Sequence, residues 1–90
     1  MSVKTYRKIP VEVKAIQYAP DNLGECVQFL ENNGARYTVT SAGTNGKTEF
    51  MIDTLENCMT VSMGDFIVCG VEDEFYPCKS DIFVKTYEKA

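Results

Sequence analysis

The chain has 90 residues, of which 44% are hydrophobic and 24% charged, and its formal net charge is −4. This length predicts a single domain, residues 1–90, with one modest core, and excludes two independent domains. No stretch approaches the roughly 20 apolar residues that cross a bilayer, and the first residues lack the apolar segment of a signal peptide. We therefore expect a cytoplasmic protein with no membrane partner.

The first quarter of the chain predicts a strand followed by a helix. Residues 11–18 are rich in β-branched side chains and alternate at first in polarity, which is typical of a strand. A helix is expected over 23–33, with Asn22 and Glu25 forming a capping box at its start and Gly34 ending it in a left-handed conformation. Its apolar residues follow the helical spacing i, i+3, i+4, i+7: Leu23, Cys26, Val27 and Leu30.

The middle of the chain predicts two strands joined by a hairpin. The strands are expected over 36–40 and 48–54, and Asn45-Gly46 between them is a pair that suits a tight hairpin turn. Residues 55–57 are expected to form a turn that leads into the last third of the chain.

The last third predicts three short strands and a closing helix. The strands are expected over 59–61, 66–69 and 74–78. Ser80 is placed to cap a helix from Asp81 to about Lys89, and its residues Phe83 and Tyr87, four apart, are expected to anchor it on the sheet.

These elements predict an α+β fold. We expect a strongly bent antiparallel sheet or small open barrel of about six strands, with one helix after the first strand and one C-terminal helix.

The four cysteines are Cys26, Cys58, Cys69 and Cys78. A reducing compartment argues against disulfides, and no pair has Cys-x-x-Cys spacing. Because the chain also has no histidine, a zinc site would need all four scattered thiolates. We interpret the cysteines as small buried hydrophobic residues, and expect no metal and no cofactor.

The sequence gives little support to catalysis. Without histidine, a serine or cysteine nucleophile lacks its usual base. The acids of residues 72–74, with Asp65, leave acid/base chemistry open, but consecutive acids in a polar turn are typical of a solvated hairpin tip. In the same way, Gly64 frees a turn and Asp65 satisfies its amides. We therefore predict that the protein is not an enzyme.

Charge is unevenly distributed along the chain. Residues 1–20 carry four cations against one acid, a net charge of +3, whereas residues 21–78 carry two cations against ten acids, a net charge of −8. Residues 79–90 carry three lysines against two acids, a net charge of +1. Cations from the two ends can form a local site for a small anion, while the acidic remainder argues against a duplex nucleic acid as partner.

The candidate ligand-binding residues are Arg7, Lys8, Gln17, Tyr76, Lys79 and Lys85. Tyr76 and Lys79 lie at a strand-to-helix junction, where an aromatic face, a cation and free helix N–H groups suit a base with a phosphate. Arg7, Lys8 and Gln17 are expected to complete this pocket from the same or a neighbouring subunit. The alternative is structural: Phe75 and Tyr76 divide between core and surface like the alternate residues of any strand, and Lys79 is merely solvated.

Three motifs suggest a relationship to a known group. They are Tyr6-Arg7-Lys8-x-Pro10-Val11-x-Val13-x-Ala15-Ile16-Gln17, Ser62-x-Gly64-Asp65-x-Ile67-x-x-Gly70, and Glu74-Phe75-Tyr76-Pro77-Cys78-Lys79-x-Asp81-Ile82-Phe83-x-Lys85-Thr86-Tyr87. In these motifs the chain resembles a family of small accessory proteins of tailed bacteriophages and prophages. It departs from that family at Met63 and Ser80, where proline is expected, and residues 36–57 match no pattern of it.

The resemblance implies a viral accessory protein in the host bacterial cytoplasm, without an established activity. Some phage proteins of this size are oligomeric sponges that sequester nucleotide immune signals. We therefore expect a non-enzymatic homo-oligomer that binds a small anionic ligand, with cyclic and signalling nucleotides as candidates. The alternative is a protein–protein inhibitor of a host factor, or a virion assembly factor, acting through the acidic surface of residues 21–78.

Overall fold

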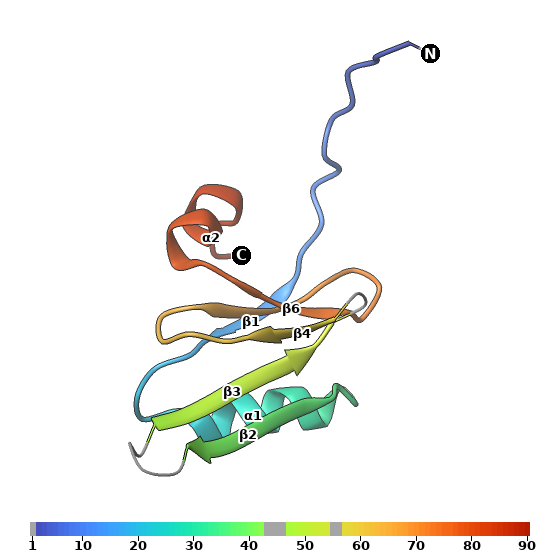
Figure 1. Cartoon of the computed structure of the whole chain (residues 1–90). Helices are drawn as coiled ribbons and strands as arrows, with labels where there is room; N and C mark the ends of the chain where they lie inside the picture. Colours follow the sequence, from blue (N-terminus) through green and yellow to red (C-terminus); the bar gives the residue numbers. More distant parts are fainter. Residues whose placement is uncertain (1, 43–46, 55–56) are drawn as a thin grey trace.

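The computed structural model describes residues 2–42, 47–54 and 57–90, and within them the chain is α+β, as predicted. The elements follow one another along the chain as shown in Figure 1: β1 (Lys14–Gln17), α1 (Leu23–Asn32), β2 (Tyr37–Ala42), β3 (Lys47–Asp53), β4 (Cys58–Thr60), β5 (Phe66–Cys69), β6 (Phe75–Cys78) and α2 (Ser80–Thr86). The predicted hairpin turn at Asn45-Gly46 and most of the predicted turn 55–57 lie outside the described residues.

The described strands form two antiparallel sheets of three strands each, where the sequence predicted one bent sheet or an open barrel. Sheet A has the order β1-β5-β6, and sheet B has the order β2-β3-β4. β6 lies next to β3 without joining its ladder. Pro77 in β6 has no N–H to donate, which favours an edge strand and keeps the two sheets separate.

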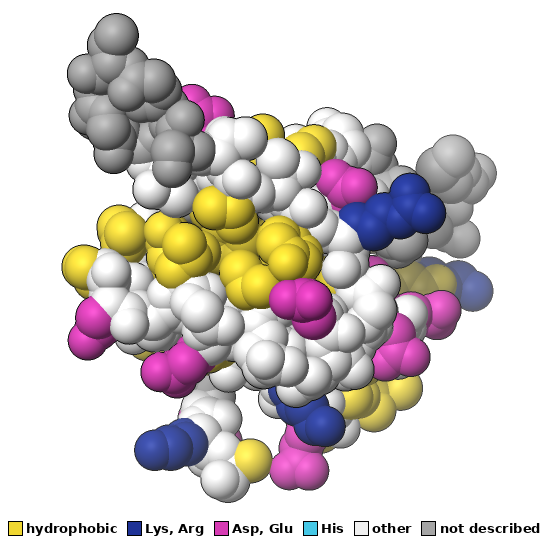
Figure 2. All heavy atoms as spheres, turned by 90° about the horizontal axis from the view of Figure 1, so that it is seen from below, with side chains coloured by type: hydrophobic (Ala, Val, Ile, Leu, Met, Phe, Trp, Pro, Cys, Tyr) yellow, Lys and Arg dark blue, Asp and Glu magenta, His cyan; other side chains and the backbone are white. Residues whose placement is uncertain are grey.

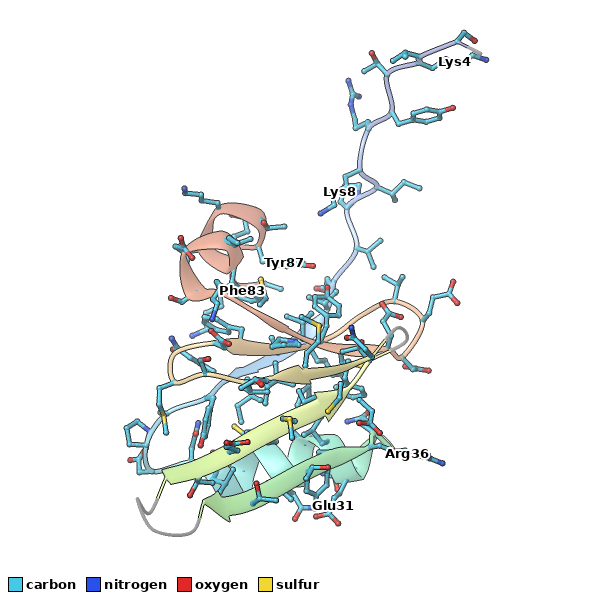
Figure 3. All side chains as sticks on the ribbon, viewed as in Figure 1. Lys4, Lys8, Glu31, Arg36, Phe83 and Tyr87 are labelled. Carbon is cyan, nitrogen blue, oxygen red and sulfur yellow. The ribbon has the colours of Figure 1, made fainter. Side chains whose placement is uncertain are left out.

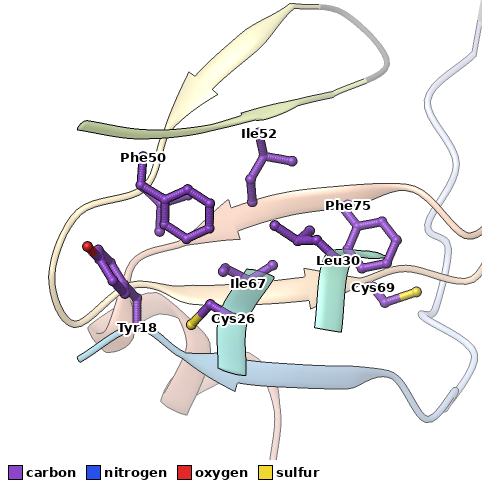
Figure 4. Packing of buried hydrophobic residues seen from close by; sticks show 9 residues of the cluster. Tyr18, Cys26, Leu30, Phe50, Ile52, Ile67, Cys69 and Phe75 are labelled. Atoms are coloured by element: carbon purple, nitrogen blue, oxygen red, sulfur yellow. The ribbon is translucent and has the colours of Figure 1, made fainter. Parts of the chain in front are cut away.

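The hydrophobic core lies between α1 and the two sheets (Figure 4). Sheet B contributes Phe50 and Ile52, and α1 contributes Leu30, each at most 1% exposed. The buried members of this cluster are Tyr18, Cys26, Leu30, Phe50, Ile52, Val61, Ile67, Cys69 and Phe75. One cluster therefore holds the helix and both sheets together.

The opposite face of sheet A is covered by α2. Phe83 of α2 stacks on Phe66 of β5, with ring centroids 3.9 Å apart and ring planes at 7°. Tyr87, which follows α2, lies within hydrogen-bonding distance of Tyr76 of β6 (3.2 Å between the hydroxyl oxygens). The prediction that Phe83 and Tyr87 anchor the last helix on the sheet is confirmed.

The helix ends differ in part from the prediction. Gly34 has φ +71°, and the N–H groups of Gly34 and Ala35 donate to the carbonyls of Glu31 and Leu30, which is the left-handed ending expected. The prediction that Asn22 and Glu25 form a capping box at the start of α1 is wrong. The Asn22 side chain instead accepts the N–H of Ala19 and donates to the Gln17 carbonyl, so it holds the connection from β1 rather than the helix.

The last helix is also shorter than predicted. It begins at Ser80, its N-cap is Lys79, and no side chain caps it, so the expected Ser80 cap is wrong. Its end is fixed by Tyr87, whose backbone is extended (φ −124°, ψ 151°). The contacts of Tyr87 with sheet A are made from this extended position.

Residues 2–13 form an extended segment, here called the N-terminal arm, that leads away from the body (Figure 1). The sequence predicted a strand from residue 11, but β5 ends at Cys69 opposite Lys14, so residues 11–13 have no partner strand. The arm helps to give a long dimension of 54 Å and a radius of gyration of 15.0 Å. A compact chain of this length would have a radius of gyration of about 12 Å.

Among the described residues, the structure contains no helix with the length and apolarity that crossing a membrane requires.

Candidate functional site

Tyr87 is the centre of a cluster of aromatic rings with one cation, here called the Tyr87 cluster: Lys8, Tyr76, Phe83 and Tyr87. The Tyr87 ring lies 4.9 Å from that of Phe83, and its hydroxyl lies 3.2 Å from that of Tyr76. Lys8 comes from the N-terminal arm, and its Nζ lies 6.0 Å from the centre of the Tyr87 ring (Figure 3). Two predicted ligand residues, Lys8 and Tyr76, are thus brought to the same tyrosine.

Tyr76 stays protonated in this cluster. Burial raises the pKa of its phenol far above the ordinary value of 10.0, and the hydrogen bond and charge of Tyr87 raise it further. A neutral phenol donates and accepts hydrogen bonds but is no nucleophile at neutral pH. The cluster therefore offers ring faces, hydroxyl groups and an ammonium, which suit binding better than chemistry.

Lys79 belongs to a different contact. Its Nζ lies 3.4 Å from Oδ1 of Asp65, whose side chain is 6% exposed while that of Lys79 is 62% exposed. The other carboxylate oxygen of Asp65 accepts the N–H of Ser62 at 2.9 Å. The prediction that Asp65 satisfies an amide of its turn is confirmed, and Lys79 has a structural partner rather than being merely solvated.

Gln17 contacts the same turn. Its Nε2 donates to the carbonyl of Gly64 at 3.1 Å, and the N–H of Gly64 donates to the carbonyl of Tyr18 at 2.8 Å. Gly64 has φ +88°, a conformation that favours glycine. Gln17 and Lys79 therefore meet at turn 62–65, while Lys8 and Tyr76 meet at Tyr87.

The other two predicted residues join neither group. Arg7 lies in the N-terminal arm and Lys85 in the last turn of α2, both are exposed, and neither makes an ion pair with a described residue. The start of α2 adds little to an anion site, because a helix of seven residues has a small dipole. The structure thus brings four of the six predicted residues together in two pairs.

One hollow of about 280 Å³ lies at the base of the arm. Its lining includes Glu12 of the arm, Lys14 of β1 and Asp73 of the β5–β6 turn. None of the predicted ligand residues lines it. Two carboxylates against one ammonium make it a poor site for an anion.

The acids of residues 72–74 form a hairpin tip, as predicted. Glu72 and Asp73 are exposed, Asp73 has φ 60°, and Glu74 folds back so that its carboxylate accepts the Glu72 N–H at 2.9 Å. Within residues 2–42, 47–54 and 57–90, no three side chains of the metal-binding types gather as a group that could hold an ion.

All four cysteines are free thiols. Cys26 and Cys69 are buried as predicted, but Cys78 is half-buried and Cys58 is exposed, so the prediction of four buried residues is wrong there. Loss of contact with water is the first cause that raises the pKa of each thiol, and nearby carboxylates raise it further, as Asp53 does for the exposed Cys58. The thiols are therefore protonated at neutral pH, the form that is a poor nucleophile.

No family model, curated protein or solved structure matches this chain. The relationship to phage accessory proteins suggested by the three motifs therefore stays a prediction, and the function rests on the geometry described above.

Sequence reasoning assigned Tyr87 a structural role and missed its place between Lys8 and Tyr76. The spacing of Phe83 and Tyr87 was a signal for the anchor, but nothing local indicates that a residue of the arm reaches the same ring. The exposed apolar residues of the arm were also missed, although Val3, Tyr6 and Ile9 recur at every third position.

Proposed function

We propose that the protein is a non-enzymatic phage accessory protein that binds and sequesters a small anionic, nucleotide-like ligand as a homo-oligomer in the host cytoplasm. The observation that carries this proposal is the Tyr87 cluster, where an ammonium from the arm lies over a tyrosine that contacts a second tyrosine. Base rings stack on aromatic faces, and phosphates pair with ammonium and guanidinium groups. Cyclic and signalling nucleotides have both features.

A neighbouring subunit would complete this site. Within the Tyr87 cluster, Tyr76, Phe83 and Tyr87 are half-buried and Lys8 is exposed, as is the neighbouring Arg7. Small-molecule sites bury most of their ligand.

Native mass spectrometry of the purified protein, with and without a mixture of nucleotides and cyclic nucleotides, tests the proposal. We expect an oligomer that retains one ligand class and returns it chemically unchanged on denaturation. A protein that ignores the whole mixture contradicts ligand binding, and a converted nucleotide contradicts a non-enzymatic role.

Lys8→Ala is the matching variant. It should weaken binding by about 1 to 3 kcal/mol, because it removes a charge-assisted contact with phosphate. Lys14→Ala, which removes an exposed cation from β1 instead, is the control and should bind like the unaltered protein. Calorimetric titration measures both, and equal affinity for the two variants would remove Lys8 as a ligand.

A protein partner is the second candidate function, and the acidic surface favours it. Exposed carboxylates lie on α1, β3 and the β5–β6 turn, at Glu31, Glu49, Asp53, Glu72 and Asp73. Such a surface would engage a basic host factor or virion component in a complex that weakens steeply with salt. This candidate predicts no bound metabolite, so the mass spectrometry above distinguishes the two.

A further inference from the structure

The outer edge of β2 is open. Within the described residues β2 pairs on one side only, with β3, and its six residues Tyr37–Ala42 include no charge and no proline. Folded proteins usually protect such an edge with charges, prolines or very short strands, because it can pair with another chain. The other three edge strands have such features: β1 carries a charge at Lys14, β4 is only three residues long, and β6 contains Pro77.

The inner face of β2 is also incompletely covered. Tyr37 and Val39 lie opposite the buried Ile52 and Phe50 of β3, so they face the core, yet Val39 is 36% exposed. Figure 2 shows hydrophobic side chains gathered on the face of the molecule where α1 and β2 lie in Figure 1. A strand added beside β2 would cover apolar surface as well as pair the open backbone.

The N-terminal arm has the composition of a strand without a partner. Val3, Tyr6 and Ile9 are 100%, 85% and 79% exposed, and residues 3–9 also contain Thr5, another residue that favours strands. The same segment carries three cations and no acid: Lys4, Arg7 and Lys8. Two such arms would repel each other, so the arm should bind an uncharged or acidic surface instead.

The edge of β2 meets this requirement. Glu31 of α1 accepts a hydrogen bond from the Tyr37 hydroxyl at 3.1 Å, and Glu49 of β3 lies opposite Thr40. The strand itself is uncharged, and its surroundings include these two carboxylates and one exposed cation, Arg36, directly before it. In Figure 1 the arm and β2 lie at opposite ends of the molecule. The arm that pairs with β2 would therefore come from a second copy of the chain.

We propose that residues 3–9 of the arm add as an antiparallel or parallel fourth strand to the open edge of β2 in a second copy of this chain. This inference specifies the interface of the oligomer in the proposed function and rests on that oligomer, but not on its ligand. Main-chain hydrogen bonds along β2 give the affinity, and pairing of Lys4 and Arg7 with the bordering carboxylates gives the specificity, while Lys8 keeps its contact with Tyr87 of its own chain.

Sedimentation velocity over a range of concentrations tests the arm in the full-length chain. The double variant Tyr6→Asp, Ile9→Asp should raise the dissociation constant of the oligomer about tenfold or more, because residues 6 and 9 lie on opposite faces of a strand and the variant puts an acid on each face. Met63→Asp alters a side chain that is 56% exposed on turn 62–65, and this control should leave the dissociation constant of the oligomer unchanged. A monomer at every concentration, or an oligomer that tolerates the double variant, overturns the proposal.

A charge at Thr38 tests the edge. Thr38 is exposed and lies opposite Met51 on the outer face of sheet B, so both of its variants should fold. Thr38→Lys should weaken the oligomer about tenfold by repelling the basic arm, whereas Thr38→Glu should preserve or strengthen it. Equal effects of the two charges, or none, would mean that the arm binds elsewhere.

Nuclear magnetic resonance on a mixture of isotope-labelled and unlabelled chains shows which copy supplies the arm. We expect contacts between residues 3–9 of one copy and residues 37–42 of the other. If such contacts arise only within one chain, the proposal that the arm adds to β2 of a second copy is wrong. Ligand titration of the same samples distinguishes this proposal from the proposed function. An oligomer that binds no nucleotide would support the pairing of the arm with β2 and contradict ligand binding. A monomer that binds a nucleotide would support ligand binding and contradict the pairing of the arm.

Discussion

Asp65 is the one charged residue that is buried within the described part of the chain, at 4% exposure. A buried carboxylate is costly unless hydrogen bonds and a counter-charge replace its water. Here the N–H of Ser62 and the ammonium of Lys79 do so. The residue thereby joins the β4–β5 turn to the end of β6.

Replacing Asp65 should destabilise the fold. We expect Asp65→Ala to lower the free energy of unfolding by about 1 to 3 kcal/mol, because the Ser62 amide loses its acceptor. Lys79→Met should cost less than about 1 kcal/mol, since the lysine side is largely solvated. Urea unfolding measures both, with Glu72→Gln as an exposed control; a cost for Lys79→Met as large as that for Asp65→Ala would contradict this ranking.

The turn around Asp65 was predicted from the sequence, but its partner was not. Gly64 and Asp65 are adjacent residues with known turn preferences, so a local pattern identifies them. Lys79 follows in sequence only after two further strands, and its pairing depends on how β5 and β6 align. This is why the sequence assigned Lys79 to a ligand or to solvent, and never to Asp65.

Helix α1 contains one glycine and is followed by another, and the two should respond oppositely to the same substitution. Gly24→Ala meets no atom within 4 Å and should stabilise the protein by up to about 1 kcal/mol, because alanine favours the helix. Gly34→Ala should destabilise it by about 1 to 2 kcal/mol, because φ +71° disfavours a side chain. Thermal unfolding compares them directly, and the same sign for both would contradict the Gly34 ending.

Prediction succeeded for elements whose signals are local. Helix α1 was predicted to within one residue at its end, and β5 was predicted as observed, because apolar spacing and turn residues define them. The predicted side-chain caps at the helix starts were wrong; at α1, Asn22 has a competing pair of backbone partners near β1. The split into two sheets was also missed, because the pairing of distant strands is decided by packing that no local pattern contains.

For the whole molecule, stability should fall at alkaline pH. Folding raises the pKa of the buried thiols above 9.0 and that of the Tyr76 phenol above 10.0. The unfolded chain therefore releases these protons at lower pH than the folded chain does, so the contribution to stability is complete below about pH 9 and is lost as pH rises through the folded values.

Urea unfolding at a series of pH values from neutral to about pH 11 checks this dependence. The free energy of unfolding should hold steady and then decline above about pH 9. Tyr76→Phe should show a shallower decline in the upper part of the range, because it removes one titrating group. A free energy that rises across this range would contradict the sign.

The candidate site was predicted only in part, because it depends on the arrangement of the whole chain. The cations and Tyr76 were found from composition, yet their division between the Tyr87 cluster and turn 62–65 depends on where the arm leaves β1. The direction of an unpaired segment has no signal in the sequence. The same is true of the open β2 edge, which exists only because the chain forms two sheets.

The extended arm also determines where a protease cleaves the protein first. Lys4, Arg7 and Lys8 lie in exposed backbone without secondary structure, whereas Lys14 is paired in β1. Trypsin should therefore cut first within residues 4–8 and leave the body intact. Cleavage after Lys8 removes three positive charges from a chain of net charge −4, leaving −7, so this product should move faster toward the anode in a native gel. If the arm pairs with β2 of another copy, trypsin should cleave it more slowly at higher protein concentration. The cleavage rate then measures how much of the protein is assembled.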